Sequence, residues 1–163
     1  MDLELRRGGV EDIDRLEPLW RSMWEHHAGL PSMPGVRDAD ESWRHRSAQY
    51  REWLADDGYG LLLAERGGEA VGYAVVSLGG GAATWGELGE RTAEIESLSV
   101  LESERGSGVG GELTRAAIAF AREAGADSVL VAAAHSNEGA LSFYRREGFS
   151  DFYVQLSHPI SND

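Results

Sequence analysis

The sequence predicts a single domain of mixed α/β class, with one central sheet covered by helices on both faces. Three patterns support this prediction: a run of alternating stretches separated by glycine turns, apolar stripes at helical spacing before and after it, and one unbroken apolar run. The expected order of elements is β-α-α-β-β-β-α-β-α-β. The chain of 163 residues (1–163) has room for one domain.

The N-terminal part is expected to hold one strand and two helices. Residues 2–6 alternate and predict the strand. Apolar residues at alternating three- and four-residue spacing from Ile13 to His27 predict a helix, and Pro18 should kink it or divide it in two. Asp40 is the expected cap of the second helix.

The middle of the chain predicts three consecutive strands. Residues 59–65 and 70–78 should form a hairpin around the turn at residues 66–69. After a glycine-rich loop at residues 79–91, residues 92–100 should form the third strand.

The C-terminal part predicts two helices that alternate with two strands. A helix from Gly108 to about Ala124 and a last helix capped by Asn137 each stop at a glycine. Residues 128–134 form an unbroken apolar run, which is typical of a strand buried on both faces. Residues 149–157 should supply the final strand.

Composition excludes several function classes. With 28 acidic and 15 basic residues the net charge is −13, so the chain is a poor candidate for the basic face that nonspecific nucleic-acid binding needs. It has no cysteine, and every basic residue is arginine, which excludes disulfides, thiolate metal sites and a Walker A lysine. No apolar run approaches the ~20 residues of a membrane helix, and the N-terminus lacks a signal-peptide stretch. We expect a cytoplasmic protein with no metal and no membrane partner.

A glycine-rich stretch between a predicted strand and a predicted helix is the clearest sign of a binding site. Its glycines allow the backbone to approach a ligand closely, and the N–H groups that open the helix favour an anion, so a phosphate or pyrophosphate is expected. Three of the glycines also fit the dinucleotide pattern G-x-G-x-x-G. However, five residues separate these glycines from the preceding strand, and the N-terminal half shows no βαβ alternation. Both observations disfavour a dinucleotide oxidoreductase. The stretch consists of Arg105, Gly106, Ser107, Gly108, Val109, Gly110 and Gly111.

With these residues the chain resembles the GCN5-related N-acetyltransferase (GNAT) family. Arg105, Gly108 and Gly110 match the Arg/Gln-x-x-Gly-x-Gly/Ala loop with which that family binds acetyl-CoA. Residues 137–149 are similar to its N-x-x-A-x-x-F-Y-x-x-x-G-F signature. The resemblance implies the GNAT fold, with residues 92–149 as the acetyl-CoA-binding core and residues 1–58 on the acceptor side.

The resemblance implies transfer of an acetyl group from acetyl-CoA to a primary amine by direct attack in a ternary complex. Tyr144 matches the tyrosine that is proposed to protonate the leaving thiolate. Glu94 and Glu96 are the candidate bases, and the choice between them is open. Strand alternation places both on one side, with Ile95 and Ser97 on the other. A non-catalytic acyl-CoA sensor of the same fold is the alternative.

The resemblance also implies how acetyl-CoA is held. A β-bulge near residues 97–99 should splay this strand from the strand at 128–134 and leave a gap for the pantetheine. The N–H of Leu98 then faces the thioester carbonyl, while Asn137 contacts CoA, caps its helix, or does both. The implied acetyl-CoA contacts are Leu98, Ser99, Val100, Arg105, Gly106, Ser107, Gly108, Val109, Gly110, Gly111, Asn137, Ala140 and Tyr144.

Charge and aromatic content bear on the acceptor. Residues 54–100 carry eight acids and two arginines, which favours a small cationic amine. The five tryptophans, expected partly in the core and partly around the acceptor, are Trp20, Trp24, Trp43, Trp53 and Trp85. Only about fourteen residues follow Phe149, so the partner subunit of a homodimer could complete the sheet edge.

Overall fold

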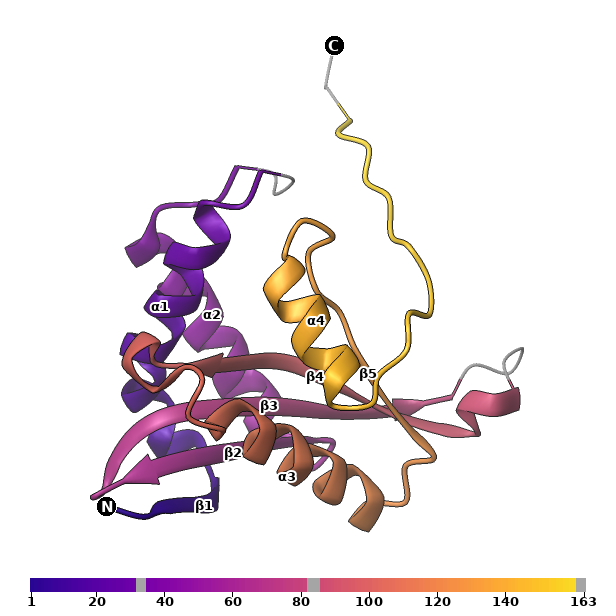
Figure 1. Cartoon of the computed structure of the whole chain (residues 1–163), viewed down its shortest axis with the longest axis horizontal. Helices are drawn as coiled ribbons and strands as arrows, with labels where there is room; N and C mark the ends of the chain where they lie inside the picture. The colour runs from indigo at the N-terminus through magenta and orange to yellow at the C-terminus, as the bar shows by residue number, and fades with distance from the viewer. Residues whose placement is uncertain (32–34, 82–85, 161–163) are drawn as a thin grey trace.

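A mixed sheet of five strands forms the centre of the computed structural model, which describes residues 1–31, 35–81 and 86–160 (Figure 1). The strands lie in chain order; the first four are antiparallel to their neighbours and the fifth is parallel to the fourth. The α/β fold expected from the sequence is therefore confirmed. The strands are β1 (Leu3–Gly8), β2 (Tyr59–Arg66), β3 (Glu69–Gly80), β4 (Arg91–Val100) and β5 (Ser128–Val131).

Helices cover both faces of this sheet. One face packs against α1 (Glu17–Ala28) and α2 (Ala39–Leu54), and the other packs against α3 (Val109–Glu123). The last helix, α4 (Glu138–Arg146), follows β5 and contacts the first turn of α3. Within the described ranges, no helix is long and apolar enough to cross a membrane.

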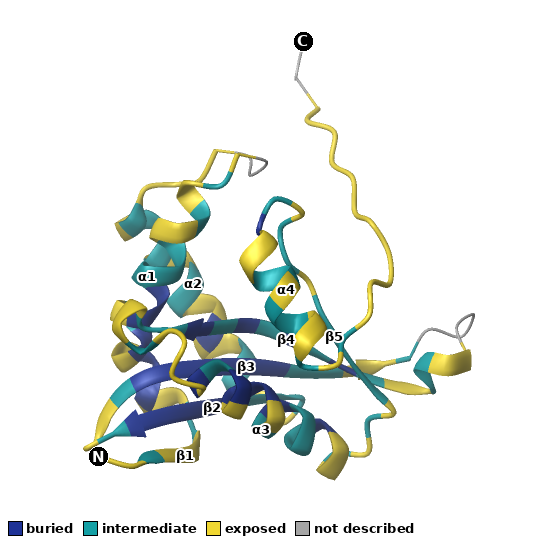
Figure 2. Cartoon of the chain, viewed as in Figure 1, coloured by how far each residue is buried: buried dark blue, intermediate teal, exposed yellow. Residues whose placement is uncertain are grey.

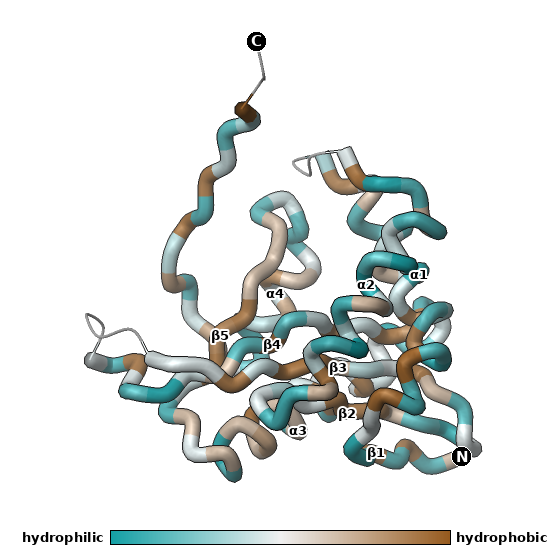
Figure 3. The backbone as a smooth tube through the Cα atoms, turned by 180° about the vertical axis from the view of Figure 1, so that it is seen from behind, coloured by the Kyte–Doolittle hydropathy of each residue, from teal (hydrophilic) through white to brown (hydrophobic). Residues whose placement is uncertain are grey.

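The core follows from strand alternation. Leu61, Leu63 and Val75 lie on the α1–α2 face, and their neighbours Leu62 and Val76 lie on the α3 face. Burial is therefore greatest along β2 and β3, where apolar residues follow one another (Figures 2 and 3).

The N-terminal helix divides at proline, as the sequence predicted. A 3₁₀ segment, Val10–Leu16, precedes α1, and Pro18 occupies the first turn of α1, where a missing N–H costs nothing. The predicted cap of the second helix is wrong. Asp38 caps α2, because its carboxylate accepts the N–H groups of Asp40 and Glu41, both at 3.1 Å.

An ion network with two buried carboxylates joins β1, the 3₁₀ segment and β2, and sequence reasoning did not predict it. The Arg6 guanidinium donates to Asp12 at 2.7 Å and to Glu65 at 3.0 Å, and Arg15 contacts both carboxylates. Hydrogen bonds from Arg6 hold the pKa of both carboxyls below the usual value. Glu65 belongs to the acidic segment 54–100, so part of that segment's charge is neutralised inside the fold.

One extra residue interrupts β4. The pairing of Val75 with Ser97 and of Val76 with Ile95 leaves Glu96 without a partner in β3, which makes it a β-bulge. The bulge reverses the alternation: Ile95 packs on the α3 face, whereas Ser97 accepts a hydrogen bond from Tyr50 of α2. The prediction that Ser97 and Ile95 share a side is therefore wrong.

The C-terminal strand predicted at residues 149–157 is also wrong, because residues 150–160 form no strand and are exposed throughout (Figure 1). The strand predicted at 128–134 is shorter and half-buried. In the described part of the chain β5 pairs with β4 alone, so it is an edge strand and is not enclosed on both sides.

Candidate active site

The open part of β4 provides backbone hydrogen-bonding groups. Pairing between β4 and β5 covers only Thr92–Ile95 and stops at the bulge. Beyond it, the N–H of Leu101 donates to Val71 of β3 at 3.0 Å. Because successive N–H groups of a strand point to opposite sides, those of Leu98 and Val100 point away from β3, toward the side where β5 no longer pairs. An extended ligand can hydrogen-bond to this edge.

Glu94 and Glu96 lie on one side of β4, as predicted, and this side faces α1 and α2. Ile95, between them, packs on the opposite face, and Glu96 accepts a hydrogen bond from the Ser77 hydroxyl at 2.6 Å. Burial raises the pKa of Glu94, and the neighbouring Glu96 carboxylate raises it further. Glu94 therefore binds a proton more readily than an ordinary glutamate does, which suits a general base.

Two buried tyrosines support this part of β4, and sequence reasoning did not assign them to the site. The Tyr50 hydroxyl donates to Ser97 Oγ at 2.7 Å and lies 3.0 Å from the Tyr73 hydroxyl. Nearby, Ser99 Oγ donates to the carbonyl of Leu19 at 2.6 Å. The side chain of Ser99, expected among the acetyl-CoA contacts, thus attaches α1 to β4, and its backbone pairs with Tyr73 of β3.

The glycine loop has the conformation that its residues suggested. Gly106 and Gly108 have φ angles of +78° and +94°, and a Cβ at either position would meet no atom within 4 Å. These glycines are therefore required by the backbone conformation, and the space beside them is open to a ligand. No side chain caps α3, so the N–H groups of its first turn are available to an anion.

Other residues of the loop make contacts within the protein. The side chain of Val109 is fully buried in the core, and a Cβ at Gly110 would approach the Phe143 ring to 3.3 Å. Arg105 donates to Ser22 of α1 at 3.0 Å, and the Ser107 hydroxyl donates to a backbone carbonyl at 2.6 Å. Gly111 is buried as well. Of the side chains predicted to bind here, only Arg105 carries charge, and it contacts α1.

Tyr144 and Asn137 come from α4 and its cap. The Tyr144 ring packs edge-on against Phe143 and Phe149, and burial raises its pKa to about 12. The phenol is therefore protonated at neutral pH and can act as a proton donor. Asn137 Oδ1 accepts the N–H of Ala140 at 3.1 Å, which confirms its predicted capping role and leaves that N–H unavailable to a ligand.

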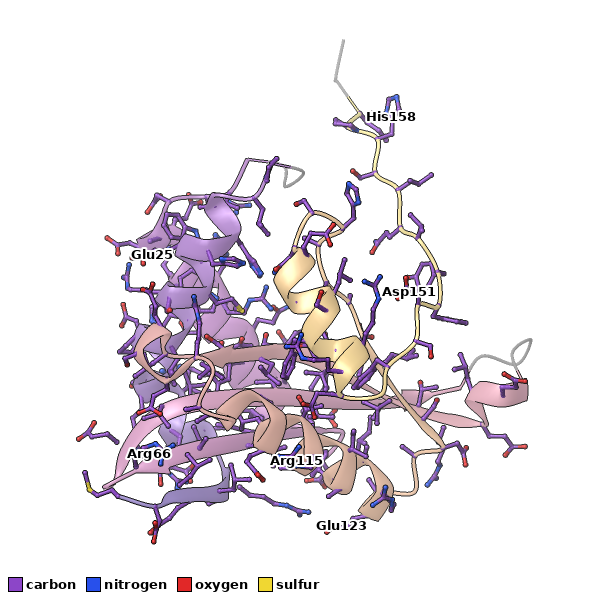
Figure 4. The ribbon with its side chains drawn as sticks, in the orientation of Figure 1. Glu25, Arg66, Arg115, Glu123, Asp151 and His158 are labelled. Carbon is purple, nitrogen blue, oxygen red and sulfur yellow. The ribbon has the colours of Figure 1, made fainter. Side chains whose placement is uncertain are left out.

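Asn137 also connects α4 to the other side of the site. Its Oδ1 lies 3.4 Å from His26 Nε2, at the C-terminal end of α1. Figure 4 shows side chains of α1, α2 and α4 above β4, with Glu25 on one side and Asp151 on the other. Asp151 pairs with Arg145 at 2.8 Å.

The tryptophans serve mainly to pack the N-terminal helices. Trp20 and Trp43 lie with ring centres 5.5 Å apart, and Trp53 stacks on Tyr59 at 5.2 Å. The Trp24 indole donates to a backbone carbonyl at 3.1 Å. Trp85 lies outside the described residues.

Comparisons with known proteins agree with this geometry. A protein-family model described as "Acetyltransferase (GNAT) family" matches residues 17–149. An uncharacterized N-acetyltransferase of Archaeoglobus fulgidus is 30% identical over 145 residues, which cover 87% of this chain and 89% of that protein. The N-alpha-acetyltransferase MAK3 of Arabidopsis thaliana is 32% identical over 125 residues, which cover 77% of this chain and 62% of that longer protein.

Solved structures show the same fold. AAC(6')-Iy, an aminoglycoside N-acetyltransferase, superimposes with a TM-score of 0.76 at 18% identity, and the match covers 99% of each chain. It was solved with the bisubstrate analogue CoA-S-monomethyl-acetylneamine and, separately, with CoA. At this identity the likeness establishes the fold alone.

The glycine loop can be tested with one substitution and a matched control. We expect Gly108→Glu to lower acetyl-CoA affinity about tenfold or more, because like charges a few ångströms apart repel by roughly 4 kcal/mol near a protein surface. Gly68→Glu is the control, since Gly68 has a φ of +83° and equally open surroundings in the β2–β3 turn. Calorimetry with acetyl-CoA measures both variants. Equal affinity in the two would contradict the assignment of the loop.

Proposed function

Because the chain belongs to the acetyltransferase (GNAT) family and is an acetyl-CoA-dependent N-acetyltransferase, we propose that it acetylates the protonated primary amine of a small acceptor. The observation that carries the proposal is the open edge of β4. The N–H groups of Leu98 and Val100 point there to the side where, in the described part of the chain, β5 no longer pairs, next to the carboxylate pair Glu94 and Glu96 on the same strand. The glycine loop follows directly in the chain.

The chain's own groups suit the binding of acetyl-CoA. When bound, acetyl-CoA supplies a thioester whose acetyl group can pass to an amine. The N–H groups of the glycine loop and of the first turn of α3 would hold the pyrophosphate. Val100 would pair with the pantetheine, and the N–H of Leu98 would donate to the thioester carbonyl oxygen, where negative charge develops during attack.

Glu94 is the proposed base. It accepts the proton of the ammonium group, directly or through water, and so frees the nitrogen lone pair for the acetyl carbon. Its raised pKa makes this transfer easier, and Glu96 contributes to that pKa while Ser77 holds its carboxylate. The charged pair also attracts the incoming cation.

Tyr144 is the proposed acid. As the carbon–sulfur bond breaks, its hydroxyl donates a proton to the sulfur. The nitrogen loses its remaining extra proton, which restores the phenol directly or through water, and the new N-acetyl amide and the free thiol of CoA leave the site. A phenol with a pKa of about 12 is almost fully protonated at neutral pH, so it is ready to donate.

The structural neighbours support a small amine as the acceptor, since AAC(6')-Iy is an aminoglycoside N-acetyltransferase. A non-catalytic acyl-CoA sensor is the competing proposal. The presence of Glu94, Glu96 and Tyr144 in this arrangement favours the enzyme.

The deciding experiment is a thiol-release assay with acetyl-CoA across a panel of amines. We expect amine-dependent release of CoA, and calorimetry should show binding of acetyl-CoA but not of NAD(H). Acetyl-CoA binding without turnover on any amine would favour the sensor instead.

For Tyr144→Phe we expect turnover to fall by about 10²–10⁴-fold, because a general acid contributes about that much. Acetyl-CoA affinity should stay near the wild-type value, since the ring and its packing are retained. Single-turnover kinetics and calorimetry measure the two quantities. An unchanged rate would mean that another group or water protonates the thiolate.

The two carboxylates can be separated by their pH profiles. Glu94→Gln should lower kcat/KM about 10²–10⁴-fold. Glu96→Gln should retain activity and move the acidic limb of the profile to lower pH, because loss of the Glu96 charge lowers the pKa of Glu94. Glu69→Gln, at an exposed position in β3, is the control. The reverse pattern would assign the base to Glu96.

A homodimer and a cytoplasmic location remain predictions. Support for the dimer comes from the exposed apolar side chains after α4, among them Tyr153, Val154 and Leu156. These could be covered by a second copy, which would also protect the free edge of β5. Sedimentation equilibrium of the whole chain would decide, and a monomer at all concentrations would exclude the dimer.

A further inference from the structure

Arg46 of α2 is a half-buried cation that no described carboxylate balances. Among the described residues three arginines are half-buried, and two of them, Arg21 and Arg66, contact carboxylates at 3.0 Å or less. For Arg46 no described carboxylate lies within ion-pair distance, and its guanidinium carbon lies 5.7 Å from the centre of the Tyr50 ring. A partly desolvated guanidinium without a counter-ion is unfavourable unless something else binds it.

The position of Arg46 is tied to the proposed acceptor side of β4. Tyr50 follows it by one turn of α2, about 5.4 Å along the helix. The Tyr50 hydroxyl donates to Ser97, which directly follows Glu96 in β4. The Arg46 guanidinium therefore lies beside the ring of Tyr50, and the hydroxyl of the same tyrosine holds Ser97, the neighbour of Glu96.

The surrounding charges agree with this placement. Burial is the main cause of the raised pKa of Tyr50. The positive charge of Arg46 lowers this pKa and the negative charge of Glu96 raises it, so both charges lie close enough to interact with the phenol. On α1, the pKa of His27 is lowered by burial first and then by His26 and Arg46. His27 is thus neutral at pH 7 and does not add a second positive charge beside Arg46.

We propose that Arg46 binds a carboxylate of the acceptor, which makes the acceptor a small amino acid that carries both charges. This inference rests on the proposed function: the ammonium group lies at Glu94 and Glu96, and the carboxylate lies at Arg46. A planar guanidinium binds a carboxylate through two parallel hydrogen bonds. A polyamine or an aminoglycoside would instead place a second cation near Arg46, which repels it.

The experiment compares amino acids with their neutral amides. The probes are glycine, β-alanine and 4-aminobutanoate against glycinamide, β-alaninamide and 4-aminobutanamide, with thiol release as the signal. We expect the wild-type enzyme to prefer at least one acid over its amide by about 10- to 100-fold in kcat/KM, the range that a hydrogen bond to a charged group provides. The preferred chain length reports the spacing between the two charges.

The variant Arg46→Gln should remove this preference by raising the KM of the acid, while its turnover of the amide stays within about threefold of wild type. The variant Arg46→Lys should retain part of the preference, because lysine keeps the positive charge. Arg44→Gln, at an exposed arginine of the same helix, should leave the preference unchanged. Thermal unfolding checks that each variant is folded. If Arg46→Gln lost kcat/KM equally on acids and amides, or if the wild-type enzyme preferred the amides, the role of Arg46 would be overturned and the proposed function would stand. Failure of every amine to react would overturn the proposed function as well.

Discussion

A single extra residue in β4 sets the geometry on which the site depends. Glu96 has no partner in β3, and the pairing of β4 with β5 stops next to it. A bulge bends its strand and increases the local twist. The last pair between β4 and β5 joins Ile95 to Val131, the residue at which β5 ends. The N–H groups of Leu98 and Val100 point to the side where β5 no longer pairs, and Glu96 itself carries one of the two carboxylates.

The helices of the acceptor side are attached to this irregular strand by buried polar contacts. Tyr50 connects α2 to Ser97, and Ser99 connects to α1 through the carbonyl of Leu19. Buried hydrogen bonds of this kind are costly to leave unmade, so they define a single arrangement of the helices over β4. The bulge makes this possible, because it turns Ser97 and Ser99 toward the helices and Leu98 toward α3.

The number of acidic residues overstates the negative charge that the folded chain can present to a substrate. Asp12 and Glu65 are buried and neutralised by Arg6 and Arg15, so they contribute to folding rather than to attraction of a substrate. Glu94 has no basic partner in the described structure, and its pKa is raised by burial and by its acidic neighbour. Glu94 and Glu96 therefore bring negative charge to the proposed acceptor side that no described arginine neutralises by direct contact.

The sequence by itself determined the elements that local chemistry specifies. The division of the first helix at Pro18, the glycines at helix ends and the Asn137 cap each depend on residues close together in the chain, and all appear in the fold. Strand alternation holds along β2 and is reversed only where the bulge interrupts β4. The glycine loop and the family signatures are local in the same sense.

Only the tertiary structure decided features that require a register between distant segments. The bulge at Glu96 exists relative to β3, and it reversed the side expected for Ser97. The ion network joins residues 59 positions apart, and the unbalanced charge of Arg46 is visible only when every nearby carboxylate has been placed. A strand was also expected at residues 149–157, but residues 150–160 form no strand in this fold. A strand forms only where its backbone groups pair with a neighbouring strand, and that pairing is decided by the tertiary structure.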